Sequence, residues 1–227
     1  MNNPGILFII IIPIVLTFII LGILYEQKRR KKRRDELRKW ADVNGLNFHP
    51  TKDRGIDGRH GEFSCLRHGH SRYAYNIIQG HYNERPLCLF DYHYVTGSGK
   101  NRRTHNFSSV IIDTQLPIKP LFIRTENFFD KVTEFVGMDD IDFEWKEFSD
   151  AFYVKSPDKK WAYDVLHQKT MEFLMGAPRF TLDFQGPLVI AYRNKRFSIN
   201  DFEDAITVIE GILNNLPDYL INELKGV

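Results

Sequence analysis

An uncharged apolar run from Gly5 to Tyr25, followed closely by seven consecutive cations, constrains this chain more than any other feature. A bilayer core of about 30 Å needs about 20 apolar residues in a helix. Pro13 lies within the run, and membrane helices tolerate the kink that a proline introduces. The sequence therefore predicts an N-terminal anchor over residues 1–27, with a transmembrane helix over about 5–25.

A cleaved signal peptide is the alternative, but it would carry basic residues before its apolar core. Here the cations follow the core instead: Lys28, Arg29, Arg30, Lys31, Lys32, Arg33 and Arg34. Because positive charge stays on the cytoplasmic side, we expect a single pass through the inner (plasma) membrane, with the N-terminus outside and the remaining chain in the cytoplasm. The cations serve as this topology signal, or they also bind anionic lipid headgroups at about 1 kcal/mol each.

The charge balance of the remaining chain limits the classes of partner. Residues 35–227 carry 24 Lys and Arg against 28 Asp and Glu, a net charge of −4, although the whole chain is +2. General nucleic-acid binding is not expected, because it needs a basic surface on the folded part. Hydrophobic residues make up 43% and there are only 2 Cys, so neither overall disorder nor a disulfide-stapled fold is expected.

The cytoplasmic part reads as an α+β fold with a mainly antiparallel sheet and several amphipathic helices. A polybasic juxtamembrane helix is expected over 28–45, followed by one domain over 46–227 with a possible weak division near 116–120. The predicted strands of a meander are 63–66, 73–81, 87–95 and 104–113, with no helix between them to support parallel crossovers. Later elements are a helix near 128–136, a strand at 140–145, a hairpin of 180–184 with 188–192, and a final helix capped by Asn200.

Histidine and aspartate pairs within the meander suggest a metal site. His68 and His70 are two residues apart, as are Asp91 and His93, so each pair shares one face if it lies on a strand. Two such pairs would supply three or four nitrogen and oxygen ligands. The sequence has no HExxH motif, and surface or half-buried imidazoles are the competing interpretation.

Three short stretches resemble a family of uncharacterised bacterial proteins that have one N-terminal span and a cytosolic domain of unknown function. They are Leu89–Tyr94, Leu116-Pro117 with Pro120–Ile123, and Phe148-Ser149 with Phe152–Val154. The resemblance covers about 36–224 and implies no activity, cofactor or site residue.

The leading hypothesis is therefore a non-catalytic, membrane-tethered module whose partners are the lipid bilayer, anionic headgroups and an unknown protein. The alternatives are a metal-dependent hydrolase or metal sensor that uses the His-rich meander, and an assembly factor for membrane complexes. No catalytic set and no cofactor is evident, and a nucleic-acid partner is not expected.

Overall fold

The computed structural model describes residues 4–125 and 140–226, with the side chains of the first helix described from Pro13 onward. The helices are α1 (Pro4–Val43), α2 (Ile56–Arg59), α3 (Lys146–Ala151), α4 (Lys159–Val165), α5 (Gln168–Gly176), α6 (Ile199–Asn214) and α7 (Asp218–Lys225), with short 3-10 turns at Ser64–Leu66 and Gly99–Asn101. The strands are β1 (Asn47–His49), β2 (His70–Tyr82), β3 (Arg85–Thr96), β4 (Arg103–Thr125), β5 (Phe152–Lys155) and β6 (Thr181–Arg193). The α+β class expected from the sequence is confirmed.

All six strands belong to one antiparallel sheet. The order is β1-β2-β3-β4-β5, and β6 pairs with β4 along the side that β3 does not occupy. The long, bent β4 is the central element, because β3 pairs with its first half and β5 with its last residues. Tight turns between β2, β3 and β4 produce three of the four predicted strands of the meander. The strand expected at 63–66 is wrong, because Ser64–Leu66 forms a 3-10 turn there.

Both faces of the sheet are covered. One face carries the larger core, in which Leu89 and Val110 of the sheet pack with Leu37 of α1 and with the apolar side of α6. The opposite face carries a smaller core, in which Phe90 and Tyr92 pack under the α2 region. Alternate residues of β3 therefore enter different cores, as strand geometry requires.

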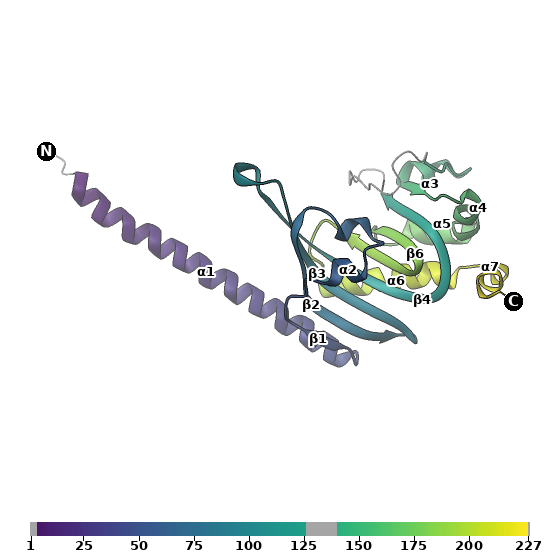
Figure 1. Ribbon diagram of the computed structural model, residues 1–227, viewed down its shortest axis with the longest axis horizontal. Coiled ribbons are helices and arrows are strands. Elements are labelled where there is room, and N and C mark those ends of the chain that lie inside the picture. The colour runs from purple at the N-terminus through teal and green to yellow at the C-terminus, as the bar shows by residue number, and fades with distance from the viewer. Residues whose placement is uncertain (1–3, 126–139, 227) are drawn as a thin grey trace.

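Helix α1 projects from the sheet as a long arm, and only its C-terminal part packs against the folded body (Figure 1). The transmembrane span predicted over 5–25 is wrong: among the residues described, no helix is long and apolar enough to cross a membrane. The single-pass topology inferred from that span loses its basis.

Several local predictions also differ from the structure. The expected hairpin of 180–184 with 188–192 is instead the continuous strand β6, because both halves find partners on β4. Ser198, not Asn200, caps α6, where it forms a reciprocal capping box with Asp201. The expected strand at 140–145 is irregular chain that buries Ile141 and Phe143.

Two further predictions concern the middle of the chain. Residues 116–120, where the sequence allowed a weak division, lie inside β4, and the larger core includes residues before and after them. The helix predicted near 128–136 lies outside the described residues.

Candidate functional site

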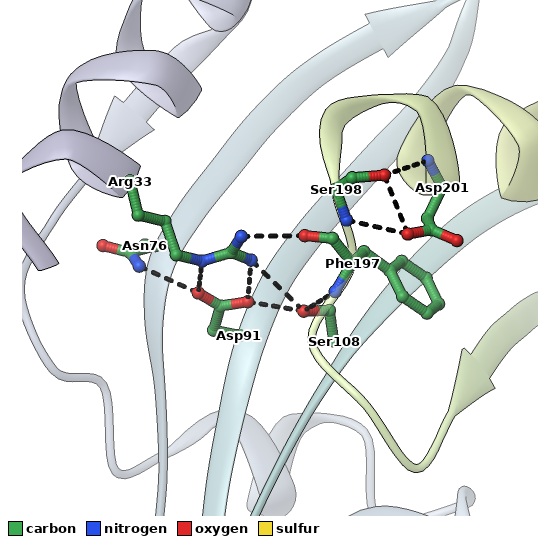
Figure 2. A network of polar contacts seen from close by, with 7 residues as sticks. All are labelled: Arg33, Asn76, Asp91, Ser108, Phe197, Ser198 and Asp201. Carbon is green, nitrogen blue, oxygen red and sulfur yellow. Dashed lines mark hydrogen bonds and ion pairs between the residues drawn. The ribbon is translucent and has the colours of Figure 1, made fainter. Parts of the chain in front are cut away.

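A buried ion pair fastens α1 to the sheet. Arg33 of α1 donates from Nε to Oδ2 of Asp91 at 2.8 Å and from Nη2 to Oδ1 at 2.6 Å, a bidentate arrangement (Figure 2). Its remaining nitrogen, Nη1, donates to the carbonyl oxygen of Phe197 at 2.8 Å, in the loop that leads into α6. One guanidinium thus joins the arm, the centre of the sheet and the start of α6.

The carboxylate of Asp91 has two more donors on neighbouring strands. The Asn76 amide donates at 2.9 Å and the Ser108 hydroxyl at 2.5 Å. Asn76 lies in the left-handed region at φ 51°, where β2 shifts register against β3. Asn accepts this conformation more readily than most residues, so the irregularity turns an amide toward the buried carboxylate at low cost.

The pair is satisfied on all sides. Asp91 is fully buried, and the side chain of Arg33 is 21% exposed. Burial works against the charged form of Arg33, but hydrogen bonding and attraction to Asp91 outweigh it and raise the pKa of the guanidinium. Loss of either partner leaves an uncompensated buried charge, so the pair fixes the position of α1 on the sheet.

The seven cations of α1 point in different directions around the helix. Arg30, Arg33 and Arg34 line the space between helix and sheet, one turn before the buried Leu37. At 100° per residue, Lys28, Lys31 and Lys32 lie about 100–160° around the helix from Arg33, and all three are exposed. Arg29 lies between the two groups, 3.6 Å from Glu26. We call Lys28, Lys31 and Lys32 the outer lysines.

A pocket of about 400 Å³ opens beside the ion pair, between α1 and the sheet, and we call it the basic pocket. This volume is in the range of small-molecule sites. Its lining is formed by Arg30, Arg33, Arg34, Pro50, Lys52, Tyr73, Tyr75, Asn76, His93, Thr104, Asn106 and Arg196. Among the lining residues that the structure describes, five side chains are cationic and none is acidic.

Not all five cations are equally available. Asp91 neutralises Arg33, and Arg30 pairs with Glu26 at 3.1 Å on the helix surface. Arg34, Lys52 and Arg196 form no ion pair with any residue that the structure describes. These three side chains, which we call the pocket cations, come from α1, the loop after β1 and the loop before α6.

Aromatic rings form one wall of the basic pocket. Tyr73 stacks on His93 with centroids 4.5 Å apart, and the Lys52 ammonium lies 4.3 Å from the Tyr73 centroid. The hydroxyl oxygen of Tyr75 is buried and has no hydrogen-bond partner in the described part of the chain. Burial, followed by the charge of Asp91, raises the pKa of Tyr75 to about 12, so the group stays a hydrogen-bond donor at neutral pH.

The residues proposed as metal ligands are divided between different surroundings. Asp91 and His93 share the face that packs against α1, but Asp91 is occupied by Arg33, and His93 Nδ1 lies 3.2 Å from the Asn106 side-chain oxygen. His68 lies against Tyr94 on the other face, and His70 Nε2 is 3.1 Å from the Gly97 carbonyl oxygen. Within the described ranges no group of three or more His, Cys, Asp or Glu side chains is placed to hold a metal ion.

Two other reactive side chains have limited exposure: Cys88 is half-buried and Asp183 is buried. Burial raises the pKa of Cys88 to about 11, which keeps its thiol protonated at neutral pH. Asp183 of β6 is 1% exposed and receives one hydrogen bond, from Gln185 at 3.0 Å. Burial raises the pKa of Asp183 to about 7.

Sequence reasoning missed the pairing of Arg33 with Asp91 and the pocket that it supports. It treated Arg33 as one of seven equivalent cations and Asp91 as a metal ligand. The available signal was a lone aspartate in the apolar strand Leu87–Tyr92, together with an arginine four residues before an apolar helix position. Lys52 and Arg196 have no such signal, because they lie far apart in the sequence.

Comparison with known proteins indicates the fold only. No family model matches the chain, and no curated protein matches it. Among solved structures, the crystal structure of the mycobacterial trehalose monomycolate transport factor A, TtfA, is similar with a TM-score of 0.60 and 8% identity. The similarity covers 80% of this chain and 92% of that one, so nearly the whole TtfA structure shares this architecture.

Proposed function

We propose that this protein is a non-catalytic module that associates with the surface of an anionic membrane through α1. The observation that carries the proposal is the order of side chains along the projecting part of that helix. Its large apolar side chains from Ile14 to Tyr25 are 48–70% exposed, and the cations follow directly. Exposed apolar surface of this extent is typical of protein or membrane interaction sites.

The charge distribution favours a membrane surface as the partner. The outer lysines are exposed to solvent, and each cation near an anionic leaflet contributes about 1 kcal/mol. The rest of the chain is net acidic, so the attraction is confined to α1 and its surroundings. Repulsion between the net acidic folded body and an anionic membrane therefore limits the membrane contact to α1.

The name of the similar structure is compatible with this role, because it describes a transport factor. A second candidate, an assembly factor for membrane complexes, uses the same exposed apolar side chains of Ile14–Tyr25 to bind a protein instead of lipid. The two differ in whether protein-free vesicles are sufficient for binding.

Vesicle flotation of the full chain tests the proposal. We expect binding to phosphatidylcholine vesicles that contain phosphatidylglycerol, weak binding to phosphatidylcholine alone, and a decrease with salt. The variant K28Q/K31Q/K32Q should weaken binding by about a hundredfold, at about 1 kcal/mol per cation. The matched control K146Q/K159Q/K169Q removes three exposed charges from α3, α4 and α5, at the end of the molecule away from α1 (Figure 1).

Equal losses in the two triple variants, or no preference for anionic vesicles, would contradict the proposal. Binding that requires a membrane protein extract, with none to pure vesicles of either kind, would favour the assembly factor.

A further inference from the structure

We propose that the basic pocket binds the phosphate group of an anionic phospholipid headgroup. This inference rests on the proposed function and deepens it, because it assigns the contact with anionic lipid to one defined site and not to non-specific charge attraction along α1. It is carried by the three pocket cations, by the Tyr75 hydroxyl and by the absence of acidic groups from the described lining.

The three pocket cations line a single pocket. They come from three separate segments, and none forms an ion pair within the part of the chain that the structure describes; the charge of Arg196 adds to that of Arg30 in lowering the pKa of Glu26. Arginine binds phosphate through two parallel hydrogen bonds, whereas lysine contributes a point charge. Arg34 and Arg196 with Lys52 therefore supply both kinds of contact, and the Thr104 hydroxyl adds a neutral donor.

The Tyr75 side chain marks where the anion would be held. Arg196 lies 6.0 Å from the centroid of its ring, which places a cation beside the aromatic wall. A buried hydroxyl without a partner costs about 1–3 kcal/mol. A phosphate oxygen that displaces the groups covering this hydroxyl would recover that cost, because an anion only accepts hydrogen bonds and this hydroxyl remains a donor.

The ion pair leaves Arg33 to position α1, while the other cations of the lining select the ligand. Without Asp91, the guanidinium of Arg33 would be a further free cation; with it, Arg33 serves to hold α1 at the correct distance from the sheet. A choline headgroup carries its own positive charge, so a pocket lined by cations disfavours it. The expected ligand is therefore a phospholipid with net negative charge.

The position of the pocket along α1 fits a lipid better than a long polyanion. Arg34 lies nine residues after Tyr25, or about 13 Å along the helix, so the pocket is close to the exposed apolar segment. A nucleic acid would extend beyond the pocket onto a body with a net charge of −4. A lipid headgroup presents one phosphate and leaves its chains in the membrane.

Titration of the full chain with soluble glycerol phosphate, followed by NMR chemical shifts, tests the site without any membrane. We expect binding by the wild type and by K28Q/K31Q/K32Q, and about a tenfold or greater loss in R34Q/K52Q/R196Q, which removes the same number of charges. Y75F is the second variant: it should weaken glycerol phosphate binding by about tenfold while the free energy of unfolding stays the same or rises, since the hydroxyl has no described partner to lose and its burial is itself unfavourable.

Each outcome decides between sources of the anion. Glycerol phosphate binding that vesicles with phosphatidylglycerol displace supports a lipid headgroup. Inorganic phosphate that binds as tightly, with no displacement by these vesicles, assigns the pocket to free phosphate and overturns the lipid assignment. No binding, or equal binding by the wild type and R34Q/K52Q/R196Q, overturns the pocket, while vesicle flotation still reports separately on the proposed function.

Discussion

Asp91 and Asp183 are both fully buried in the same sheet, yet their surroundings are opposite. Asp91 lies on the face that α1 covers and accepts hydrogen bonds from Arg33, Asn76 and Ser108. Asp183 lies between Leu182 and Phe184, which enter the larger core, so its own side chain points to the other face. There it receives one amide donor, from Gln185, and no ion-pair partner within the described chain.

The difference shows what a buried carboxylate requires from the elements around it. A charge in the interior is retained only where a cation and further donors reach it, and otherwise the group stays protonated. Asp91 obtains its cation from α1, a helix that projects out of the fold. Because burial of the Asp91 carboxylate is tolerated only when Arg33 pairs with it, the ion pair holds α1 in place. Asp183 has no such cation, and burial raises its pKa to about 7 instead.

The largest expected effect comes from removing the cation of Asp91. Arg33→Ala should destabilise the full chain by about 3–5 kcal/mol, because it leaves a buried carboxylate without its charge partner. Urea unfolding followed by tryptophan fluorescence measures this loss. A change no larger than that of an exposed arginine would show that Asp91 does not depend on α1.

The opposite sign is expected at the other carboxylate. The folded pKa of Asp183, about 7, lies above the value of about 3.9 in an unfolded chain. Between about pH 4 and 7 the folded state keeps a proton that the unfolded state has lost, so the unfolding free energy falls as pH rises through this window.

Asp183→Asn should therefore stabilise the protein at pH 8, by at most about 4 kcal/mol at 1.36 kcal/mol per pKa unit. It should also flatten the decline between about pH 4 and 7. Glu62 adds to the raised pKa and Arg67 opposes it, so both residues stay unchanged in this comparison. Unfolding curves at several pH values test the sign, and a variant less stable than the wild type at pH 8 would refute it.

A smaller effect compares the neutral donors of the two carboxylates. Asn76→Gly keeps a residue that accepts the left-handed backbone and removes an amide bonded to a charged oxygen, so a loss of about 1.5–3 kcal/mol is expected. Gln185→Ala removes a donor to a group that is largely protonated below pH 7, and about 1 kcal/mol is expected there. Parallel urea titrations at pH 6 test the order, and equal losses would remove the distinction.

The smallest effect on folding is expected one residue away from Arg33. Arg34→Gln should leave the unfolding midpoint unchanged, since this side chain is exposed and makes no ion pair with a described residue. The same substitution should weaken glycerol phosphate binding. A marked loss of stability with normal binding would indicate that Arg34 is a structural residue and not part of a ligand site.

The sequence predicts much of the sheet because its signals are local. Alternating apolar residues with tight turns locate the meander of β2, β3 and the start of β4. The error at 180–192 has a different cause, since Gln185-Gly186-Pro187 looks like a turn, and only pairing along β4 shows that the strand continues. Long-range pairing of this kind is not encoded in the neighbouring residues.

The site was less predictable than the fold for the same reason. The cations of α1 are evident in the sequence, but which of them faces the sheet depends on the contact between Arg33 and Asp91, 58 positions apart. The transmembrane prediction over 5–25 rested on composition and was wrong, because no helix among the described residues is long and apolar enough to cross a membrane. Lys52 and Arg196 join the basic pocket only through the tertiary fold.

A double-mutant cycle of Arg33→Met and Asp91→Asn tests most directly the claim that this pair fastens α1 to the sheet. Each single variant should lose about 3–5 kcal/mol, and the double variant should lose much less than their sum, because removing both charges together leaves no unpaired buried charge. A coupling energy of about 2 kcal/mol or more is the expected result. Losses that add within about 0.5 kcal/mol would mean that the two side chains act independently and would contradict the account.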